Sequence, residues 1–339
     1  MVKGAGLRIL SYRSSWVQIP LSALDVFLII NYGKFIMITY SAPGKICLFG
    51  EHGVVYGKHS IACAINLRTY VSIEKLPFLS KTYIENNSYR QNINQNKYIF
   101  ELWKEMKKII DLENFIIKIK SQIPICSGLG SSSALIIALI SCLNKYYNYN
   151  LNLNEIAKIG HQIEKNVQGL ASPMDTYISS FGGLIKFPEK KKIPFFDWDI
   201  IICNSMNKSN TINLVNKVKL LKNKYPTIIN SIFKSMDFIV LEAEKSILKK
   251  DIYKFGEMMN LNQGLLESIG ISSKKLSNLI YNLNNYGSFG SKITGSGGGG
   301  CIISVAKDSI SNNICSIMNK KNYQTFLCRP TKYGVRYEY

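Results

Sequence analysis

The sequence predicts an α+β protein with two domains. Up to about residue 200, apolar and β-prone segments alternate with segments of helical spacing. Beyond residue 200 the pattern changes to long amphipathic helices, which end at a glycine-rich stretch followed by a strand-like segment. The length of 339 residues suits two domains of ordinary size, and a hydrophobic content of 46% is enough for a buried core. We therefore expect domains at 37–199 and 200–339.

In the first domain, a Pro-Gly turn is expected to separate Tyr40 and Ser41 from an apolar strand at 46–49. The β-prone stretch 61–73 and the alternating stretch 115–119 predict two more strands. Helical spacing predicts helices over 98–110 and 153–167, and another that follows a Gly/Ser loop at 127–133. The second domain is expected to contain helices at 212–221, 228–248, 252–266 and 275–284, and a strand at 301–305.

The first 36 residues differ in character from the rest and show no clear period. From Met37 the pattern becomes coherent, so we expect either a non-native extension that precedes the true start at Met37, or a disordered or loosely docked tail. The apolar stretch 26–30 is far shorter than the roughly 20 residues that a membrane span needs. No small-residue cleavage site follows it, so neither a membrane association nor a signal peptide is expected.

The formal net charge of +20 allows two interpretations. A basic excess can serve nucleic-acid binding, but the lysines are scattered and the longest dense run is 190–192. We therefore expect a solvated basic surface and no nucleic-acid partner. The eight cysteines form no Cys-x-x-Cys pair, which favours reduced thiols in a cytoplasmic protein over a zinc ribbon or redox motif.

The strongest local signal for chemistry is the segment 124–134, in which an apolar strand runs into Gly and Ser residues that open a helix. A helix start offers unpaired N–H groups and the positive end of its dipole. Glycines let the backbone approach an anion, so the segment is typical of a phosphate-binding loop. It is not a Walker P-loop, because no Gly-x-x-x-x-Gly-Lys-Ser/Thr occurs. The alternative is a structural turn that caps a helix.

Two carboxylates are candidates for the chemistry. Asp175 follows a proline and precedes a β-prone run, where it could accept or orient a hydroxyl proton. An aspartate near proline is more often a turn residue or helix cap. Glu164 lies on the predicted helix before it and would matter if the fold aims it at phosphates, where Mg²⁺ takes one or two carboxylates. Otherwise it is a solvated surface residue.

Two further segments are rich in glycine. Lys45 follows the Pro-Gly turn, and Glu51 and His52 lie between glycines at the end of the apolar strand, where their side chains are expected to enter a cleft. A lone histidine is otherwise often structural. Near the C-terminus, five of the six residues at 295–300 are glycine. This run suits a close approach to another backbone or a ligand, and the strand after it argues for a packed loop over a flexible hinge.

Together these segments resemble the GHMP kinase superfamily, whose motifs are Pro-Gly-Lys…Gly-Glu-His, Gly-Leu-Gly-Ser-Ser and a C-terminal glycine-rich loop. All three occur here in order, over about 40–305. The segments 50–57, 171–177 and 259–266 resemble the mevalonate kinases, particularly the shorter archaeal form. The resemblance implies a ribosomal-protein-like βαβ first domain and a helix-rich second domain with an antiparallel sheet.

The resemblance also implies an ATP-dependent kinase that phosphorylates the 5-hydroxyl of mevalonate, with phosphomevalonate kinase as the nearest alternative. Asp175 would be the catalytic carboxylate and Lys45 would neutralise charge. Glu51, His52 and Thr294 would meet the substrate, and Ser132 and Glu164 would hold Mg²⁺. The loop that binds ATP, the co-substrate, would comprise Pro124, Ile125, Cys126, Ser127, Gly128, Leu129, Gly130, Ser131, Ser132, Ser133 and Ala134. A homodimer is also implied.

Three positions depart from the family pattern. Gly53 and Ser133 stand where alanine is common, and Cys126 stands where glycine is common. All three exchange one small residue for another, which concerns the geometry of the loops and not the class of reaction. The rival from another class is a nucleic-acid-binding protein without activity, but such a binder would not need Lys45, Glu164 and Asp175 together.

Overall fold

The computed structural model describes residues 36–76, 79–86, 89–110, 112–124, 127–169 and 171–339. Two β-sheets organise this part of the chain, one of eight strands and one of four. The expectations for residues 1–35, Ile125 and Cys126 lie outside it. Among the helices described, none is long and apolar enough to cross a membrane. The cysteines within the described ranges are free thiols.

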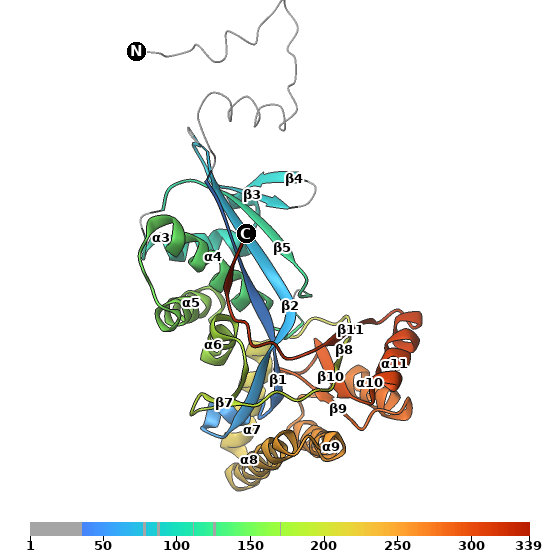
Figure 1. Ribbon diagram of the computed structural model, residues 1–339. Coiled ribbons are helices and arrows are strands. Elements are labelled where there is room, and N and C mark those ends of the chain that lie inside the picture. Colours follow the sequence, from blue (N-terminus) through green and yellow to red (C-terminus); the bar gives the residue numbers. More distant parts are fainter. Residues whose placement is uncertain (1–35, 77–78, 87–88, 111, 125–126, 170) are drawn as a thin grey trace, which may run out of the picture.

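The larger sheet has the strand order β12-β1-β2-β5-β3-β4, with β6 paired to β2 and β7 paired to β6. Its longest strands are β1 and β2, which form one long antiparallel pair through the molecule (Figure 1). The strands are β1 (Ile36–Phe49), β2 (Ser60–Lys75), β3 (Tyr83–Asn86), β4 (Tyr89–Asn92), β5 (Ile116–Ser121), β6 (Leu184–Phe187), β7 (Lys191–Ile193) and β12 (Arg336–Glu338).

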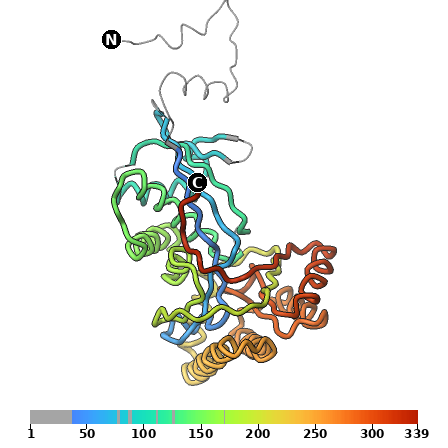
Figure 2. Tube along the Cα trace, in the orientation of Figure 1, coloured from blue at the N-terminus to red at the C-terminus, as the bar shows by residue number. Residues whose placement is uncertain are grey.

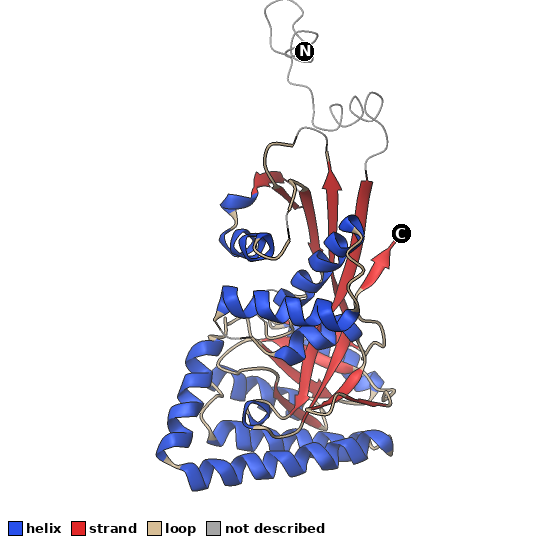
Figure 3. Cartoon of the chain, turned by 90° about the vertical axis from the view of Figure 1, so that its left-hand side faces the viewer, coloured by secondary structure: helices blue, strands red, loops and turns tan. Residues whose placement is uncertain are grey.

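Helices cover one face of this sheet. The helix α4 (Ser131–Tyr147) packs directly on β1 and β2, and its residues from Ala134 to Leu143 are almost all buried. The helices α5 (Leu153–Gln168) and α6 (Pro173–Phe181) pack against α4, and α3 (Lys97–Lys107) packs on α5. Figure 3 shows the helices beside the strands. α5 begins with a capping box in which Asn152 and Glu155 satisfy each other's backbone N–H groups. This packing fixes α5 and α6 beside the start of α4.

The smaller sheet is antiparallel, in the order β11-β8-β10-β9. Its strands are β8 (Ile200–Asn204), β9 (Gly290–Ile293), β10 (Cys301–Val305) and β11 (Gln324–Cys328). Strand residues point alternately to the two faces, and here both faces are apolar. Ile200 and Ile202 join the core shared with the larger sheet, whereas Ile201 and Cys203 join a second core under the C-terminal helices.

Long helices surround the smaller sheet, as the helical spacing predicted. They are α7 (Thr211–Lys224), α8 (Pro226–Leu248), α9 (Ile252–Ser268), α10 (Lys274–Asn285) and α11 (Asp308–Lys320). Figure 2 shows α8 and α9 side by side as an antiparallel pair. The mixed α+β class is confirmed. The division into domains at residue 200, which is the first residue of β8, stays a prediction.

The structure corrects two expectations about local structure. The predicted Pro-Gly turn is wrong, because Pro43 and Gly44 lie inside β1, which continues across them with a register shift opposite β2. The extra residues of this register shift lie on β2, where 65–67 stand opposite Gly44, and β1 continues through the proline. The run after Asp175 is also not a strand: Pro173 occupies the first turn of α6, where its missing N–H costs nothing, and the residues after it are helical.

Candidate active site

The predicted phosphate loop ends at the first turn of α4. Gly130 is the N-cap residue with φ of 72°, and Gly128 has φ of 79°, a conformation that favours glycine. Within the described part of the loop, no side chain caps this helix start. Its first N–H groups and dipole therefore remain available for an anion, as the prediction required.

The loop lies against β1 at the register shift between Pro43 and Lys45. The Lys45 backbone N–H donates to the Leu129 carbonyl at 2.9 Å. A Cβ on Gly130 would lie 2.8 Å from Cγ of Lys45, so any larger residue would displace the lysine. The Lys45 side chain thus extends from β1 past the loop, and the absence of a side chain on Gly130 leaves space for it.

Lys45 and Asp175 form an ion pair beside the phosphate loop. Lys45 Nζ lies 3.2 Å from Asp175 Oδ2, and the lysine side chain is only 6% exposed. Burial alone would lower the pKa of Lys45, but the Asp175 carboxylate outweighs it and raises that pKa. The other oxygen, Asp175 Oδ1, is buried and has no hydrogen-bond partner among the residues that the structure describes. A buried acceptor left without a donor points to a ligand.

Glu164 of α5 faces the start of α4, close to the Lys45–Asp175 pair. It accepts hydrogen bonds from Ser132 Oγ at 2.5 Å and from Ser133 Oγ at 2.9 Å. Burial, followed by repulsion from Asp175, raises the pKa of Glu164 to about 7. The hydroxyl of Ser133, at a position where the family commonly has alanine, therefore gives Glu164 a second donor.

This donor set suits a magnesium ion bound together with phosphates. Mg²⁺ prefers one or two carboxylates plus phosphate and water oxygens, and Ser132, Glu164 and the free oxygen of Asp175 supply oxygen donors. Within the described ranges, no three His, Cys, Asp or Glu side chains form a complete metal site. Phosphate oxygens would have to complete the coordination.

Glu51 and His52 are turned towards the second domain. The Glu51 carboxylate is fully buried, forms an ion pair with Lys292 of β9, and accepts from Asn262 Nδ2 at 3.3 Å. His52 Nε2 lies 3.0 Å from the carbonyl oxygen of Ser296, and burial lowers its pKa. Their contact with substrate stays a prediction.

Thr294 also bonds to the protein itself. Its Oγ1 accepts from the Cys47 N–H at 3.0 Å and donates to the Cys47 carbonyl at 2.9 Å. The hydroxyl therefore ties β9 to β1, and its predicted substrate contact remains untested.

The C-terminal glycine run packs against the phosphate loop. Cys301 N–H donates to the Ser127 carbonyl at 3.1 Å, and a Cβ on Gly300 would lie 2.8 Å from that same oxygen. A Cβ on Gly299 would lie 2.6 Å from the Asn207 carbonyl. The packed loop predicted from the glycine content is confirmed, and a flexible hinge is excluded.

Two residues of this region were not predicted. Lys292 was given no role, although a lysine inside an apolar strand next to a glycine run needs a buried acid as partner. Asn262 lies in the segment 259–266 and is fully buried on α9. The signal available in the sequence was an amide residue within a segment predicted to form an amphipathic helix.

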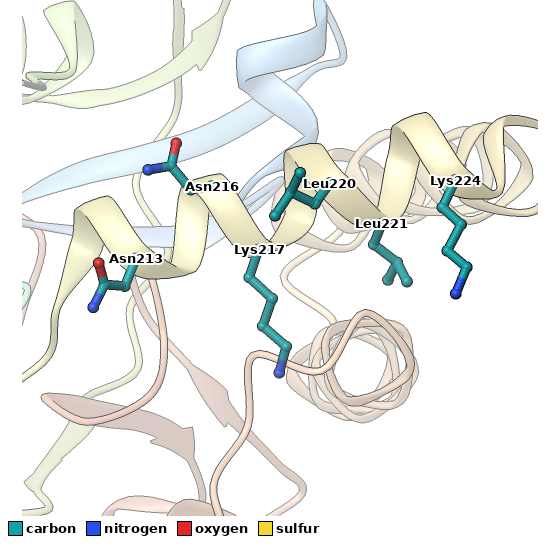
Figure 4. A pocket seen from close by; sticks show the side chains of 6 residues that line it. All are labelled: Asn213, Asn216, Lys217, Leu220, Leu221 and Lys224. Carbon is teal, nitrogen blue, oxygen red and sulfur yellow. The ribbon is translucent and has the colours of Figure 1, made fainter.

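A separate depression lies along α7 and is lined by Asn213, Asn216, Lys217, Leu220, Leu221 and Lys224 (Figure 4). All six side chains come from one helix, and Lys217 already donates to the Gly270 carbonyl at 2.5 Å. None of the predicted site residues lines it, so we place the active site at the Lys45–Asp175 pair.

Comparison with known families agrees with this geometry. Residues 97–183 match the GHMP kinases N terminal domain and residues 243–324 match the GHMP kinases C terminal domain. The chain is 35% identical to the mevalonate kinase of Thermococcus gammatolerans, covering 88% of this chain and 97% of that protein. It is 36% identical to that of Archaeoglobus fulgidus, covering 88% and 99%.

The chain belongs to the mevalonate kinase family of the GHMP kinases. The Methanococcus jannaschii mevalonate kinase structure superposes with a TM-score of 0.74 at 31% identity, covering 88% of this chain and 99% of that one. The two-domain GHMP kinase fold is confirmed. Residues 31–75 also match a galactokinase galactose-binding signature. That match covers a small part of the chain, whereas the likeness to mevalonate kinases covers most of it.

Proposed function

We propose that the chain transfers the γ-phosphoryl group of ATP to the 5-hydroxyl of (R)-mevalonate, giving 5-phosphomevalonate and ADP. The observation that carries this proposal is the Lys45–Asp175 pair beside the uncapped start of α4, in a chain of the mevalonate kinase family. Membership of that family supports mevalonate as the acceptor. The site supports the reaction class, because phosphoryl transfer depends mainly on positioning and charge stabilisation.

Asp175 is proposed to receive the acceptor proton. The hydroxyl oxygen forms a bond to the γ-phosphorus, the bond from that phosphorus to the β,γ-bridging oxygen breaks, and ADP leaves. The hydroxyl proton passes to the carboxylate, whose Oδ1 has no partner among the described residues. Lys45, held 3.2 Å from Oδ2, forms an ion pair with the carboxylate and offsets the negative charge of the transferring group.

The remaining roles concern the triphosphate. The N–H groups at the start of α4 and the hydroxyls of the loop serines would bind its oxygens. Ser132 and Glu164 would hold Mg²⁺, which supplies neutralising charge between the β- and γ-phosphates when bound. Ser132 Oγ donates to the Glu164 carboxylate, which holds these two oxygen groups side by side.

The test is a coupled assay of ADP release with a panel of acceptors: mevalonate, phosphomevalonate, galactose and homoserine. We expect turnover with mevalonate and Mg²⁺-ATP, and little with the others. Turnover with phosphomevalonate but not mevalonate would move the chain to phosphomevalonate kinase, the nearest alternative. Omitting Mg²⁺ should abolish activity, and adding it back should restore it.

A cytoplasmic location and a homodimeric assembly complete the proposal, and both rest on the family likeness. Light scattering of the purified chain checks the assembly, and fractionation of the native cells checks the location. Salt-sensitive RNA binding without ADP release would instead favour the nucleic-acid-binding rival.

A further inference from the structure

The C-terminal segment, residues 330–338, leaves the smaller sheet and returns to the larger one. Figure 1 shows this red chain passing from β11 across to β1, where β12 pairs with Thr39–Ser41. On the way it bonds to the end of α6 and to the chain just after it: Val335 N–H donates to the Ser180 carbonyl at 3.1 Å, and Gly183 N–H donates to the Thr331 carbonyl at 2.8 Å. The segment therefore crosses the last turn of α6.

The crossing leaves no spare room. A Cβ on Gly182 would lie 2.5 Å from the backbone nitrogen of Gly334, and a Cβ on Gly334 would overlap the carbonyl oxygen of Ser180. Backbone is packed on backbone at this point, so the position of the C-terminal segment and the position of α6 depend on each other.

Arg68 of β2 holds this crossing against β1. Its guanidinium is buried and donates to Ser41 Oγ at 2.7 Å, to the Ser41 carbonyl at 2.9 Å and to the Gly334 carbonyl at 2.7 Å. A longer bond at 3.4 Å reaches the Tyr333 carbonyl. Burial lowers the pKa of Arg68 to about 10, which leaves it charged at neutral pH. The planar guanidinium has several donors in fixed directions, so it can hydrogen-bond to β1 and to the C-terminal segment at the same time.

The two elements joined in this way are those that carry the catalytic pair. Asp175 lies in the first turn of α6, and Lys45 lies on β1 two residues after Pro43, at the register shift opposite β2. Ser179 Oγ of α6 also donates to the Pro43 carbonyl at 3.1 Å. Arg68 touches neither Lys45 nor Asp175, but it binds β1 four residues before Lys45 and binds the segment that packs on the end of α6.

We propose that Arg68 is a positioning residue for phosphoryl transfer, acting through the C-terminal segment to fix the distance between Lys45 and Asp175. The inference rests on the proposed function of that pair. A displacement of about 1 Å at reacting groups can cost on the order of 10²-fold in rate. Loosening this support should therefore lower turnover more than substrate binding.

The test uses Arg68→Lys and Gly334→Ala in the full chain, with kcat and both KM values measured by ADP release. We expect kcat to fall at least ~10-fold, with the KM for ATP changed less than about twofold, because the phosphate loop is not part of the crossing. Arg68→Met should lose more kcat than Arg68→Lys, which keeps the charge and some of the bonds. Arg329→Lys, at an exposed ion pair with Asp199, is the matched arginine control.

Gly264→Ala is the matched glycine control, because a Cβ there meets no described atom within 4 Å. Both controls should keep wild-type kcat. Circular dichroism and melting curves give the folded fraction of every variant. The inference is overturned by unchanged kcat in folded Arg68→Lys and Gly334→Ala, by a loss confined to KM, or by a loss that only follows the folded fraction. Absence of mevalonate turnover in the wild-type chain instead contradicts the proposed function, and the variants are then compared on the acceptor that is active.

Discussion

At the scale of single residues, Asp175 is placed unlike an ordinary aspartate of a helix start. One oxygen faces Lys45 at 3.2 Å, and the other is buried with no partner in the part of the chain that the structure describes. An unpaired buried acceptor costs roughly 1–3 kcal/mol. That cost is recovered when a donor such as a hydroxyl arrives, which is why this oxygen is the expected proton acceptor.

Asp175→Asn should therefore lower kcat by at least ~10²-fold, the usual scale for a positioned proton acceptor. The amide keeps the shape of the side chain but loses the charge that pairs with Lys45. ATP binding should be nearly unchanged, as measured with a fluorescent nucleotide analogue. Asp197→Asn, at an exposed ion pair with Lys250, is the control and should retain turnover. Near-normal turnover of the Asp175 variant would exclude it as the key carboxylate.

Glu164 gives a prediction about pH. Burial, followed by repulsion from Asp175, raises its pKa to about 7 in the folded chain, from the ordinary value of 4.5. The folded state therefore binds a proton that the unfolded state releases between these values, so the free energy of unfolding falls as pH rises from about 4.5 to about 7. At about 1.4 kcal/mol per pKa unit, the effect is up to roughly 3 kcal/mol.

This contribution can be measured by urea unfolding without nucleotide or Mg²⁺, at several pH values. Glu164→Gln should remove the fall in stability, because its amide does not titrate. Glu155→Gln, on the same helix but exposed, should keep it. An identical pH profile for wild type and Glu164→Gln would show that folding does not shift the pKa of Glu164.

Lys45 and Asp175 could be named as candidates from the sequence because each lies in a short motif. The pairing of Glu51 with Lys292 could not, since the two residues are 241 positions apart and nothing local couples them. The resemblance implied a substrate contact for Glu51, whereas the structure shows both of its oxygens bonded within the protein. Long-range partners of buried charges are set by the fold.

At the scale of elements, the long helices were predicted well because their apolar faces repeat over several turns. Helices α8 and α9 begin and end within two residues of the predicted limits. The errors in the predicted local structure lie where the residues are compatible with two different backbone conformations. Pro43-Gly44 is compatible with a turn or with a continuous strand, and pairing with β2 decides for the strand. The three residues of β12 are too few to give a periodic signal.

The contact between the two glycine loops gives a prediction at this scale. Gly300→Ala should raise the KM for ATP several-fold and lower the melting temperature, because its Cβ would press on the Ser127 carbonyl of the phosphate loop. Gly169→Ala is the control: its φ of 76° is close to the 74° of Gly300, but a Cβ there meets no described atom within 4 Å.

Both variants carry the cost of a left-handed alanine, roughly 1–2 kcal/mol. Only the Gly300 variant adds the clash, so the difference between the two isolates the packing of one loop on the other. Equal melting temperatures and equal KM values for Gly300→Ala and Gly169→Ala would show that the phosphate loop can move to accommodate the extra methyl group at no measurable cost.

At the scale of the whole molecule, the ion pair between Glu51 and Lys292 links the two sheets. Lys292 is fully buried in β9, and Glu51 follows the end of β1. Removing one partner of a buried pair leaves an uncompensated charge, which typically costs 3–5 kcal/mol. Lys292→Met should therefore destabilise the chain by roughly this amount in chemical denaturation.

Lys245→Met is the comparison, because Lys245 and Glu242 form an exposed pair one helical turn apart and such pairs contribute little. The double variant Glu51→Leu with Lys292→Met should recover much of the loss, since no buried charge remains. A destabilisation by Lys292→Met no larger than that by Lys245→Met would contradict a structural role for the pair.

The return of β12 to the larger sheet bears on how the chain is made. Ser41 and Glu338, bonded across β1 and β12, are 297 residues apart. At about 5–20 residues per second, the ribosome needs roughly 15–60 s to synthesise the interval. Throughout that time the outer edge of β1 near Ser41 lacks its partner strand, and exposed strand edges attract other chains. We expect nascent chains stopped before residue 336 to depend on chaperones more than the full chain does.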